Sequence, residues 1–177
     1  MEQDGVIVRA VLSGDVERYA VLISRYRDRY ARYATQMLGS RDAAEDAVQD
    51  AFVRAYDQLS QCRDPDNFAG WFFLILRNRC FAERRREKRF SGLDEAADVP
   101  TQNEDPGRPL ERMEDVRALQ RALLELTAEQ REVFVLKHVD GLTYETIAAQ
   151  TGATVASLKM RMHRAYDRLR DLLKDKL

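Results

Sequence analysis

The chain has 177 residues, 45% hydrophobic and 33% charged, a balance typical of a soluble globular protein with one medium or two small domains. Its two cysteines and two histidines are too few and too scattered for a disulfide framework or a zinc site, so we expect neither metal nor cofactor. The longest apolar run, residues 71–76, cannot cross a bilayer, and the acidic N-terminus lacks the apolar part of a signal peptide. These features predict a cytoplasmic protein without membrane insertion.

The net charge of −1 hides an uneven distribution along the chain. Residues 1–90 carry a net charge of +2, residues 91–115 a net charge of −6 and residues 116–177 a net charge of +3. The distribution of charge matters more than its total for binding a polyanion. Two mildly basic parts on either side of an acidic connector are therefore compatible with a nucleic-acid partner.

Apolar residues in the N-terminal part recur at the spacing of an amphipathic helix, which predicts a helical bundle. The stripe consists of Leu12, Tyr19, Leu22, Tyr26, Tyr30, Ala34 and Leu38. The next helix is expected over residues 42–59, with Asp42 and Glu45 as a capping box and with Val48 and Phe52 facing inward. The polar side of that helix carries Asp46, Gln49 and Asp50, which by themselves indicate only a solvated face.

A long helix is predicted over residues 69–90, after a loop at 61–67 that contains Pro65. The helix begins with aromatic and apolar residues and then turns basic, with a net charge of +5 over residues 77–89. Arginine side chains neutralise phosphates, and an exposed aromatic such as Trp71 can stack on an unpaired base. The alternative for the aromatic residues is a place in the core, and it stays open. The basic side chains considered for nucleic acid are Arg77, Arg84, Arg85 and Lys88.

Residues 91–115 contain three of the four prolines and show no helical period, so they are expected to form a flexible linker. The chain is thereby divided into a domain at 1–90, a linker and a domain at 116–177. A coil of this length spans roughly 25–30 Å on average. Two domains joined in this way can occupy separate sites on one large partner.

The C-terminal part has the pattern of a helix-turn-helix. Thr127 and Gln130 predict a capped helix that ends near Val139, and a second helix follows the turn at residues 140–141. Thr154 is expected to cap a third helix after a tight turn. The pattern itself consists of a small residue at Ala148, a turn glycine at Gly152 and a core leucine at Leu158.

The third helix has an apolar stripe and an opposite face suited to the major groove of DNA. That face carries Lys159, Met160, His163 and Arg164, and it is flanked by Arg161, Arg168 and Arg170. Arginines at the flanks are suited to phosphates. The alternative is a helical hairpin with a solvated basic side.

Taken together, these residues resemble an extracytoplasmic-function (ECF) sigma factor over about residues 6–90 and 116–174. Residues 42–52 are similar to the polymerase-binding helix of sigma region 2, and residues 71–89 to the helix that reads the minus-ten element. Residues 141–148 and the basic helix after them resemble region 4, which reads the minus-thirty-five element. The resemblance implies an initiation factor without catalysis or small-molecule substrate, which binds core RNA polymerase and promoter DNA and is held by an anti-sigma factor.

The resemblance also implies roles for matched positions. The residues that it implies for contact with polymerase are Asp46, Gln49, Asp50 and Phe52. The loop at 62–67, which ends at Asn67, resembles one that captures a flipped base, and Asn78 matches a position that helps to read the minus-ten bases. The residues that the resemblance implies for contact with the bases of the minus-thirty-five element, upstream of the minus-ten element, are Lys159, Met160, His163 and Arg164. The sequence departs from the family at Leu74, Thr127, Thr146, Met160 and Tyr166. The minus-thirty-five sequence that it recognises is therefore the property least safely inferred from the family.

Two other classes compete with this reading. A helix-turn-helix regulator that binds an operator as a dimer is the first, but it has no need for the aromatic-to-basic helix, and little chain follows Leu172 to form a dimer. An enzyme is the second, and the sequence shows no phosphate-binding glycine loop, nucleophile elbow or clustered metal ligands.

Overall fold

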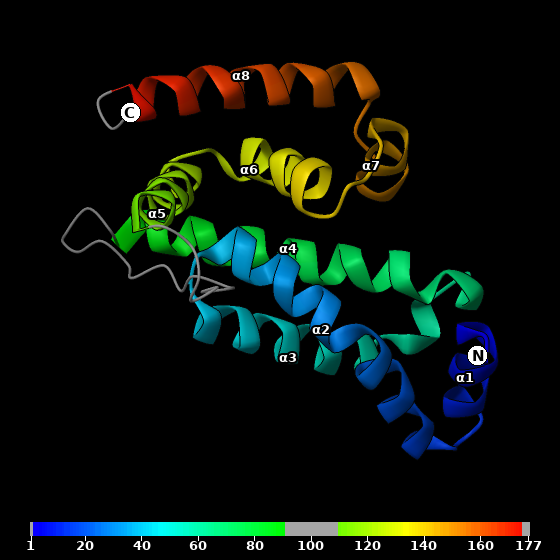
Figure 1. Ribbon diagram of the computed structural model, residues 1–177. Helices are drawn as coiled ribbons and strands as arrows, with labels where there is room; N and C mark the ends of the chain where they lie inside the picture. The colour runs from blue at the N-terminus through cyan, green and yellow to red at the C-terminus, as the bar shows by residue number, and fades with distance from the viewer. Residues whose placement is uncertain (1, 91–109, 175–177) are drawn as a thin grey trace.

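The computed structural model describes residues 2–90 and 110–174, and its regular structure in these ranges is entirely helical (Figure 1). The predicted all-α fold class is therefore confirmed. The first half comprises α1 (Asp4–Leu12), η1 (Val16–Arg18), α2 (Tyr19–Leu38), α3 (Arg41–Asp57), η2 (Leu59–Gln61), η3 (Pro65–Asn67) and α4 (Phe68–Phe90). The second half comprises α5 (Leu110–Leu124), α6 (Ala128–Phe134), a π-helical turn η4 (Val135–Val139), α7 (Tyr144–Thr151) and α8 (Val155–Leu173).

Helices α2, α3 and α4 pack side by side around an aromatic centre. The ring of Phe72 stacks on Phe52, with 4.2 Å between their centroids, and lies 4.9 Å from the ring of Tyr30. Phe52 thus faces inward, as predicted, and Phe72 belongs to the core. The expected stripe fails at Leu12, which is 50% exposed because α1 ends there and the chain turns away.

Helix α3 begins one residue earlier than the sequence suggested, and its cap is different. The hydroxyl of Ser40 accepts a hydrogen bond from the backbone N–H of Ala43. The predicted capping box of Asp42 and Glu45 is therefore wrong. Ser40 has an extended backbone, as a capping residue must, whereas Asp42 already lies within the first helical turn.

The predicted linker at 91–115 is too long at its C-terminal end, because α5 begins at Leu110. Leu110, Met113 and Val116 follow one another at intervals of three, which is the start of a helical period that continues into the rest of α5. The remainder of the predicted linker, residues 91–109, lies outside the described residues.

The second half contains the predicted helix-turn-helix. Thr127 and Gln130 form a complete capping box at the start of α6, and the Thr154 hydroxyl caps α8 by accepting from the backbone N–H of Ser157. Between α7 and α8, Gly152 has a φ of 74°, a left-handed conformation that favours glycine. Leu158 is buried, as the pattern requires.

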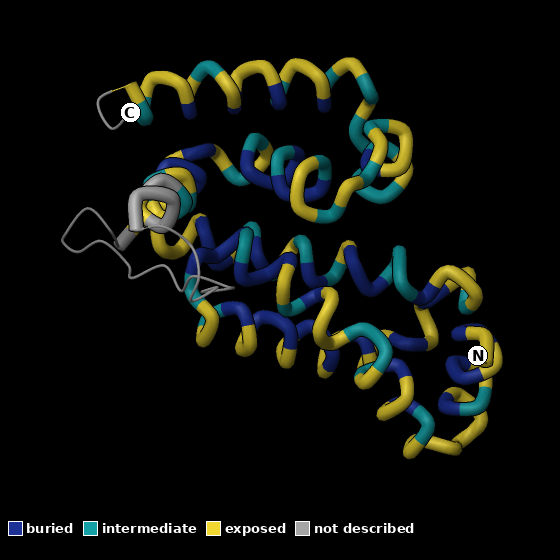
Figure 2. The backbone as a smooth tube through the Cα atoms, in the orientation of Figure 1, coloured by how far each residue is buried: buried dark blue, intermediate teal, exposed yellow. Residues whose placement is uncertain are grey.

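The two halves are packed against each other and share a continuous hydrophobic core. Val133, Leu136 and Ile147 of the second half join the buried cluster of the first half. The second half lies as a layer over α2 and α4, on the side away from α3, and buried residues line the facing surfaces (Figure 2). The sequence suggested domains free to stand apart, whereas in this conformation they form one body.

Cys62 and Cys80 are buried free thiols. Burial raises the pKa of Cys80 to about 12, so its thiol stays protonated and unreactive near neutral pH. Among the described helices, none has both the length and the apolar character needed to span a membrane.

Candidate functional site

Helix α8 presents a basic and polar face to solvent. Its apolar stripe, which includes Leu158, Met162, Ala165 and Leu169, is buried against the rest of the second half. The opposite face points away from the protein, and exposed residues run along the outer side of α8 in Figure 2. The exposed side chains there are those of Lys159, Met160, His163 and Arg164, whereas Arg161 at their flank is half-buried. The predicted face of the third helix is thus accessible as a unit.

A second candidate surface is a hollow of about 570 Å³ between α2 and α3. Phe52 is largely buried, while Gln49 on the same helix is exposed beside it. Val53 and Tyr56 add large side chains that are 58% and 41% exposed. A partly apolar hollow with exposed aliphatic and aromatic side chains is suited to receive a protein partner.

The remaining residues predicted for this surface lie outside the hollow. Asp46 and Asp50 are exposed on the polar side of α3. A carboxylate oxygen of Asp50 accepts a hydrogen bond from Arg79 Nε at 2.9 Å, so this side chain is already paired with α4. The hollow and the acidic side of α3 are therefore neighbouring parts of one exposed surface.

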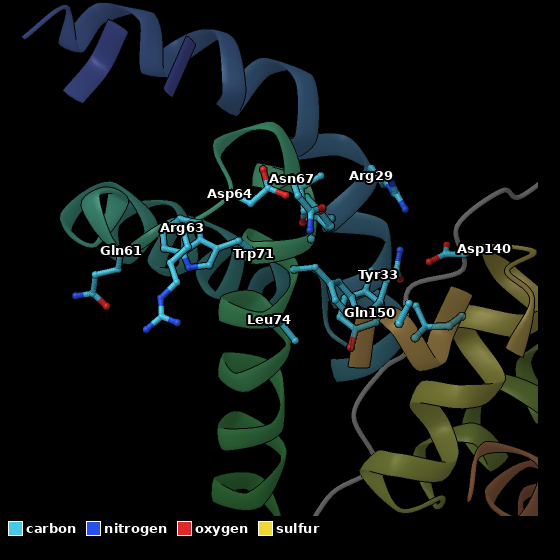
Figure 3. A pocket seen from close by; sticks show the side chains of 16 residues that line it. Arg29, Tyr33, Gln61, Arg63, Asp64, Asn67, Trp71, Leu74, Asp140 and Gln150 are labelled. Carbon is cyan, nitrogen blue, oxygen red and sulfur yellow. The ribbon is translucent and has the colours of Figure 1, made fainter. Parts of the chain in front are cut away.

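A cavity of about 620 Å³ lies where the loop before α4 meets the second half (Figure 3). From the first half come Asn67 in η3, Trp71 at the start of α4 and Arg29 on α2. Figure 3 shows Asp140 and Gln150 of the second half on the other side of the same cavity. The cavity combines an amide, a guanidinium and an aromatic face, which are groups that recognise nucleobases and phosphates.

Comparison with known proteins identifies the family. The models of Sigma-70 region 2 and Sigma-70, region 4 match residues 22–90 and 116–169. The chain is 32% identical over 142 residues to the ECF RNA polymerase sigma factor EcfG of Rhodopseudomonas palustris, with 80% of this chain and 77% of that relative covered. The chain belongs to the ECF RNA polymerase sigma factors.

Two further matches have different extents. An ECF RNA polymerase sigma factor of Mycolicibacterium smegmatis, SigE, is 33% identical over 86% of this chain, but the match spans only 60% of that relative's length. The solved complex of the sigma factor RpoE with the anti-sigma factor NepR from Bartonella quintana has a TM-score of 0.67 and 26% identity, with 90% of this chain and 98% of that chain covered.

This sigma factor is accordingly a transcription initiation factor, and its matched regions can be placed on the fold. Region 2 extends from α2 to the end of α4 and includes the α2–α3 hollow and the first-half wall of the cavity. Region 4 extends from within α5 to within α8 and includes the helix-turn-helix. Helix α1 precedes the region 2 match.

The basic half of α4 differs from the prediction, because two of its arginines are occupied inside the protein. Arg84 is 5% exposed and donates hydrogen bonds to the carbonyls of Met37, Leu124 and Leu126. These carbonyls lie at or just beyond the ends of α2 and α5, where helices leave acceptors unsatisfied. The prediction that Arg84 binds phosphate is wrong for this conformation, since its guanidinium satisfies buried main-chain groups.

Arg77 is also engaged between the halves. Its Nε and Nη2 atoms donate to the two carboxylate oxygens of Glu132, at 2.5 Å and 2.9 Å. Glu132 is buried, and Tyr33 donates a third hydrogen bond to it at 3.2 Å. While this pair holds, Arg77 is not available to DNA, in contrast to the prediction from sequence.

The other predicted residues of α4 remain accessible. Asn78, Arg85 and Lys88 are exposed, and Trp71 is half-buried at the cavity. Asn67 is likewise exposed at the end of η3. These five side chains and those of the α8 face are the predicted DNA-binding residues that solvent can reach.

A second buried arginine lies close to Arg84. Arg131 is 2% exposed, and its Nε and Nη1 atoms have no hydrogen-bond partner in the described residues. Burial, together with the positive charge of Arg84, lowers the pKa of Arg131 to about 9. Glu87 offsets part of this repulsion. The contact between the halves thus contains one satisfied ion pair and one costly pair of like charges.

Sequence reasoning missed the residues that close the cavity and join the halves. The sequence singled out neither Arg29 nor Glu132, and position 140 was considered only as part of the turn at residues 140–141. Burial raises the pKa of Asp140, although Arg29 and Arg32 partly oppose this effect. Arg77 and Glu132 are far apart in the chain, as are Arg29 and Asp140, and no local sequence pattern predicts contacts of this kind.

Proposed function

We propose that three surfaces of this sigma factor divide the work of promoter-specific initiation. The α2–α3 hollow and the adjoining side of α3, with Asp46, Gln49, Asp50 and Phe52, bind core RNA polymerase. Loop 62–67 and the exposed part of α4 read and open the minus-ten element. The outer face of α8 reads the minus-thirty-five element. Residues 1–90 and 116–177 act as the two functional domains, joined by the segment between them.

The observation that carries this proposal is the exposed face of α8. Lys159, Met160, His163 and Arg164 project from one side of the second helix of a helix-turn-helix, while the apolar stripe on the other side is buried. Such a helix can enter the major groove without disturbing its own domain. The lysine and arginine suit guanine edges, and Met160 offers an apolar contact that suits a thymine methyl group.

The minus-ten surface requires the two halves to separate. Asp140 and Gln150 form one wall of the cavity that Asn67 and Trp71 line, and Glu132 occupies the guanidinium of Arg77. A phosphate can reach the guanidinium of Arg77 only after Glu132 has moved away, and the wall formed by Asp140 and Gln150 limits the space for a nucleobase beside Asn67 and Trp71. Binding to polymerase supplies the free energy for opening, because it holds the two domains at separate promoter elements.

We also propose a protein inhibitor for this factor. A sigma factor of similar fold forms a complex with the anti-sigma factor NepR. An inhibitor that binds both halves of this chain would stabilise the closed arrangement and deny access to Arg77 and the cavity. The factor would act in the cytoplasm, with polymerase, and perform no catalysis of its own.

Reconstituted transcription tests the proposal. The purified factor is added to core RNA polymerase on a library of genomic promoter fragments, and transcript start sites are mapped. Transcripts from a subset of promoters that share upstream and minus-ten elements are the expected result. Tight dimeric binding to duplex DNA without polymerase, and no promoter-specific transcript with it, would instead establish the helix-turn-helix regulator.

The exposed cations of α4 supply a sharper test of the minus-ten surface. The double variant Arg85→Ala/Lys88→Ala should reduce the slope of log affinity against log salt by about one unit for each phosphate that is no longer neutralised. A matched control is Arg54→Ala on α3, a position exposed to solvent but not assigned to DNA. An unchanged slope for the double variant would exclude this part of α4 from the DNA interface.

A further inference from the structure

Helix α1 lies outside the region 2 match and has no part in the function proposed above, but it packs closely against the loop that forms one wall of the cavity. Five of its nine residues are buried, among them Ile7 and Val8, which are fully so. Its neighbour is η3, the turn that ends at Asn67. Helix α1 is therefore in direct contact with the turn that carries Asn67.

Gly5 provides the closest approach on the α1 side. A Cβ atom at this position would lie 2.1 Å from Oδ1 and 2.7 Å from Cγ of Asp66, far inside van der Waals distance. One turn further along α1, Nη1 of Arg9 lies 3.7 Å from Oδ2 of the same carboxylate. The side chain of Asp66 therefore rests on the bare backbone of α1, in a place that only glycine leaves open.

Gly70 has the corresponding role on α4. A Cβ atom there would lie 2.6 Å from Oδ1 and 3.0 Å from Nδ2 of Asn67. Neither Gly5 nor Gly70 has a positive φ, so neither is required by backbone conformation. Glycine within a helix is less favourable than alanine. The absence of a side chain at both positions is therefore explained by the space that Asp66 and Asn67 occupy.

The other side of α1 is fixed to the helical bundle. The carboxylate of Asp4 accepts hydrogen bonds from Arg25 and from the hydroxyl of Tyr26, both on α2, and it is 9% exposed. Within the loop, the N–H of Asn67 donates to the carbonyl of Asp64 at 3.0 Å, and the thiol of Cys62 donates to the same carbonyl at 3.4 Å. Loop 62–67 is thus ordered by its own hydrogen bonds and lies against a helix that is itself tied to α2.

We propose that Gly5 and Gly70 are positioning residues for base recognition. They seat the side chain of Asp66 against α1 and that of Asn67 against α4, and so set the shape of loop 62–67 at the cavity. The inference rests on the proposed role of this loop in reading the minus-ten element. It extends the specificity determinants to α1 and to Gly70, which lines the cavity but carries no side chain.

The test substitutes alanine at each glycine and measures base preference. Wild-type protein, Gly5→Ala and Gly70→Ala are compared with core RNA polymerase on promoters randomised at the minus-ten element. Asp66 and Asn67 are both exposed, so they can swing into solvent and the variants are expected to fold. We expect Gly70→Ala to reduce discrimination at one minus-ten base by about fivefold. This is the loss of affinity that one mismatched base pair causes at the lower end of its usual range. Gly5→Ala should produce a smaller change at the same base.

Two double variants separate positioning from general damage. If Gly70 acts through Asn67, Gly70→Ala should change nothing further in an Asn67→Ala background. Gly5→Ala/Asp66→Ala should return to the preference of Asp66→Ala alone, because the clashing atoms have been removed. Val6→Ala, on the exposed side of α1, serves as the matched control and should behave as wild type.

The outcomes distinguish this inference from the proposed function. Unchanged minus-ten preference in Gly5→Ala and Gly70→Ala, with wild-type protein showing clear preference, would overturn the positioning role alone. An additive effect of Gly70→Ala in the Asn67→Ala background would overturn it as well. Wild-type protein that gives no promoter-specific transcript would overturn the proposed function and this inference with it. Polymerase affinity and upstream preference should remain those of the wild type in both variants.

Discussion

Helices α4 and α8 are both long and basic, and both were predicted from sequence to contact DNA, but their cationic side chains have opposite surroundings. Two arginines of α4, Arg77 and Arg84, are engaged at the contact between the halves. The cations on the outer face of α8 are exposed to solvent. The difference shows that a run of arginines can serve a protein contact as readily as a nucleic acid, and that exposure decides between them.

The largest effect is expected when the carboxylate that is paired with Arg77 is removed. Glu132→Ala should destabilise the packed arrangement by about 3 kcal/mol, because the half-buried guanidinium of Arg77 then loses its carboxylate partner and is left with the ring of Phe81. Chemical unfolding gives the free energy, and energy transfer between labels on α3 and α8 should report a larger separation of the halves. The double variant Arg77→Met/Glu132→Met should recover most of the loss. Unfolding of the single variant at the wild-type denaturant concentration would show that the pair does not hold the halves together.

On α8, exposure predicts an effect on sequence preference instead of stability. Lys159→Ala or Arg164→Ala should cost about 1–3 kcal/mol of discrimination at one position of the upstream element and leave other promoters nearly unaffected. The measurement is transcription from promoters that differ only in that element. Arg168→Ala, at the flank of the same helix, is the control and should weaken all promoters alike. Equal loss on every promoter for Lys159→Ala would contradict direct base reading.

Arg84 and Arg131 are buried like charges at the contact between the halves, so removing one of them should increase stability. Arg131→Met should stabilise the closed arrangement by about 1 kcal/mol, because a charge that is 2% exposed and incompletely hydrogen-bonded is replaced by an apolar side chain of similar length. Thermal unfolding tests this, with Arg121→Met on the exposed side of α5 as the control. A loss of stability would mean that Arg131 has a favourable partner that outweighs its burial.

The smallest expected effect concerns acid pH. Burial raises the pKa of the Asp140 carboxyl above its ordinary value, so the folded state favours the protonated form. Stability from this group is therefore present at low pH and is lost as the pH rises through the shifted pKa. Asp140→Asn should remove that dependence and stabilise the protein at neutral pH by a few tenths of a kcal/mol. Unfolding measured between pH 4 and 7 would reveal the flattened profile, and identical profiles would contradict the sign.

Local patterns in the sequence predicted the helices and several of their caps. Thr127 and Thr154 cap α6 and α8 as expected, and Gly152 takes the left-handed turn. Errors arose where two local signals competed. Ser40 and Asp42 are both good capping residues, and only the backbone geometry selects the serine.

The candidate site was predictable to the extent that it depends on one face of one helix. The apolar stripe of α8 determines which side chains point outward, so its exposed residues follow from periodicity alone. Arg77 and Arg84 do not follow in this way, because their partners come from other helices. The chain separation between Arg77 and Glu132 is 55 residues, and the pairing depends on how two domains pack.

The π-helical turn η4 contains one residue more than an α-helical turn would need. The N–H of Asp140 donates to the carbonyl of Val135, five residues earlier, at 3.1 Å. Five residues of a π-turn cover about the same rotation as four residues of an α-helix, so deleting one residue here would restore ordinary pairing and leave the direction of the following chain nearly unchanged. The carboxylate of Asp140 would then stay at the cavity wall, and α7 would keep its contact with α4. Deletion of Val139, which is uncharged and 50% exposed, should thus preserve the contact between the halves.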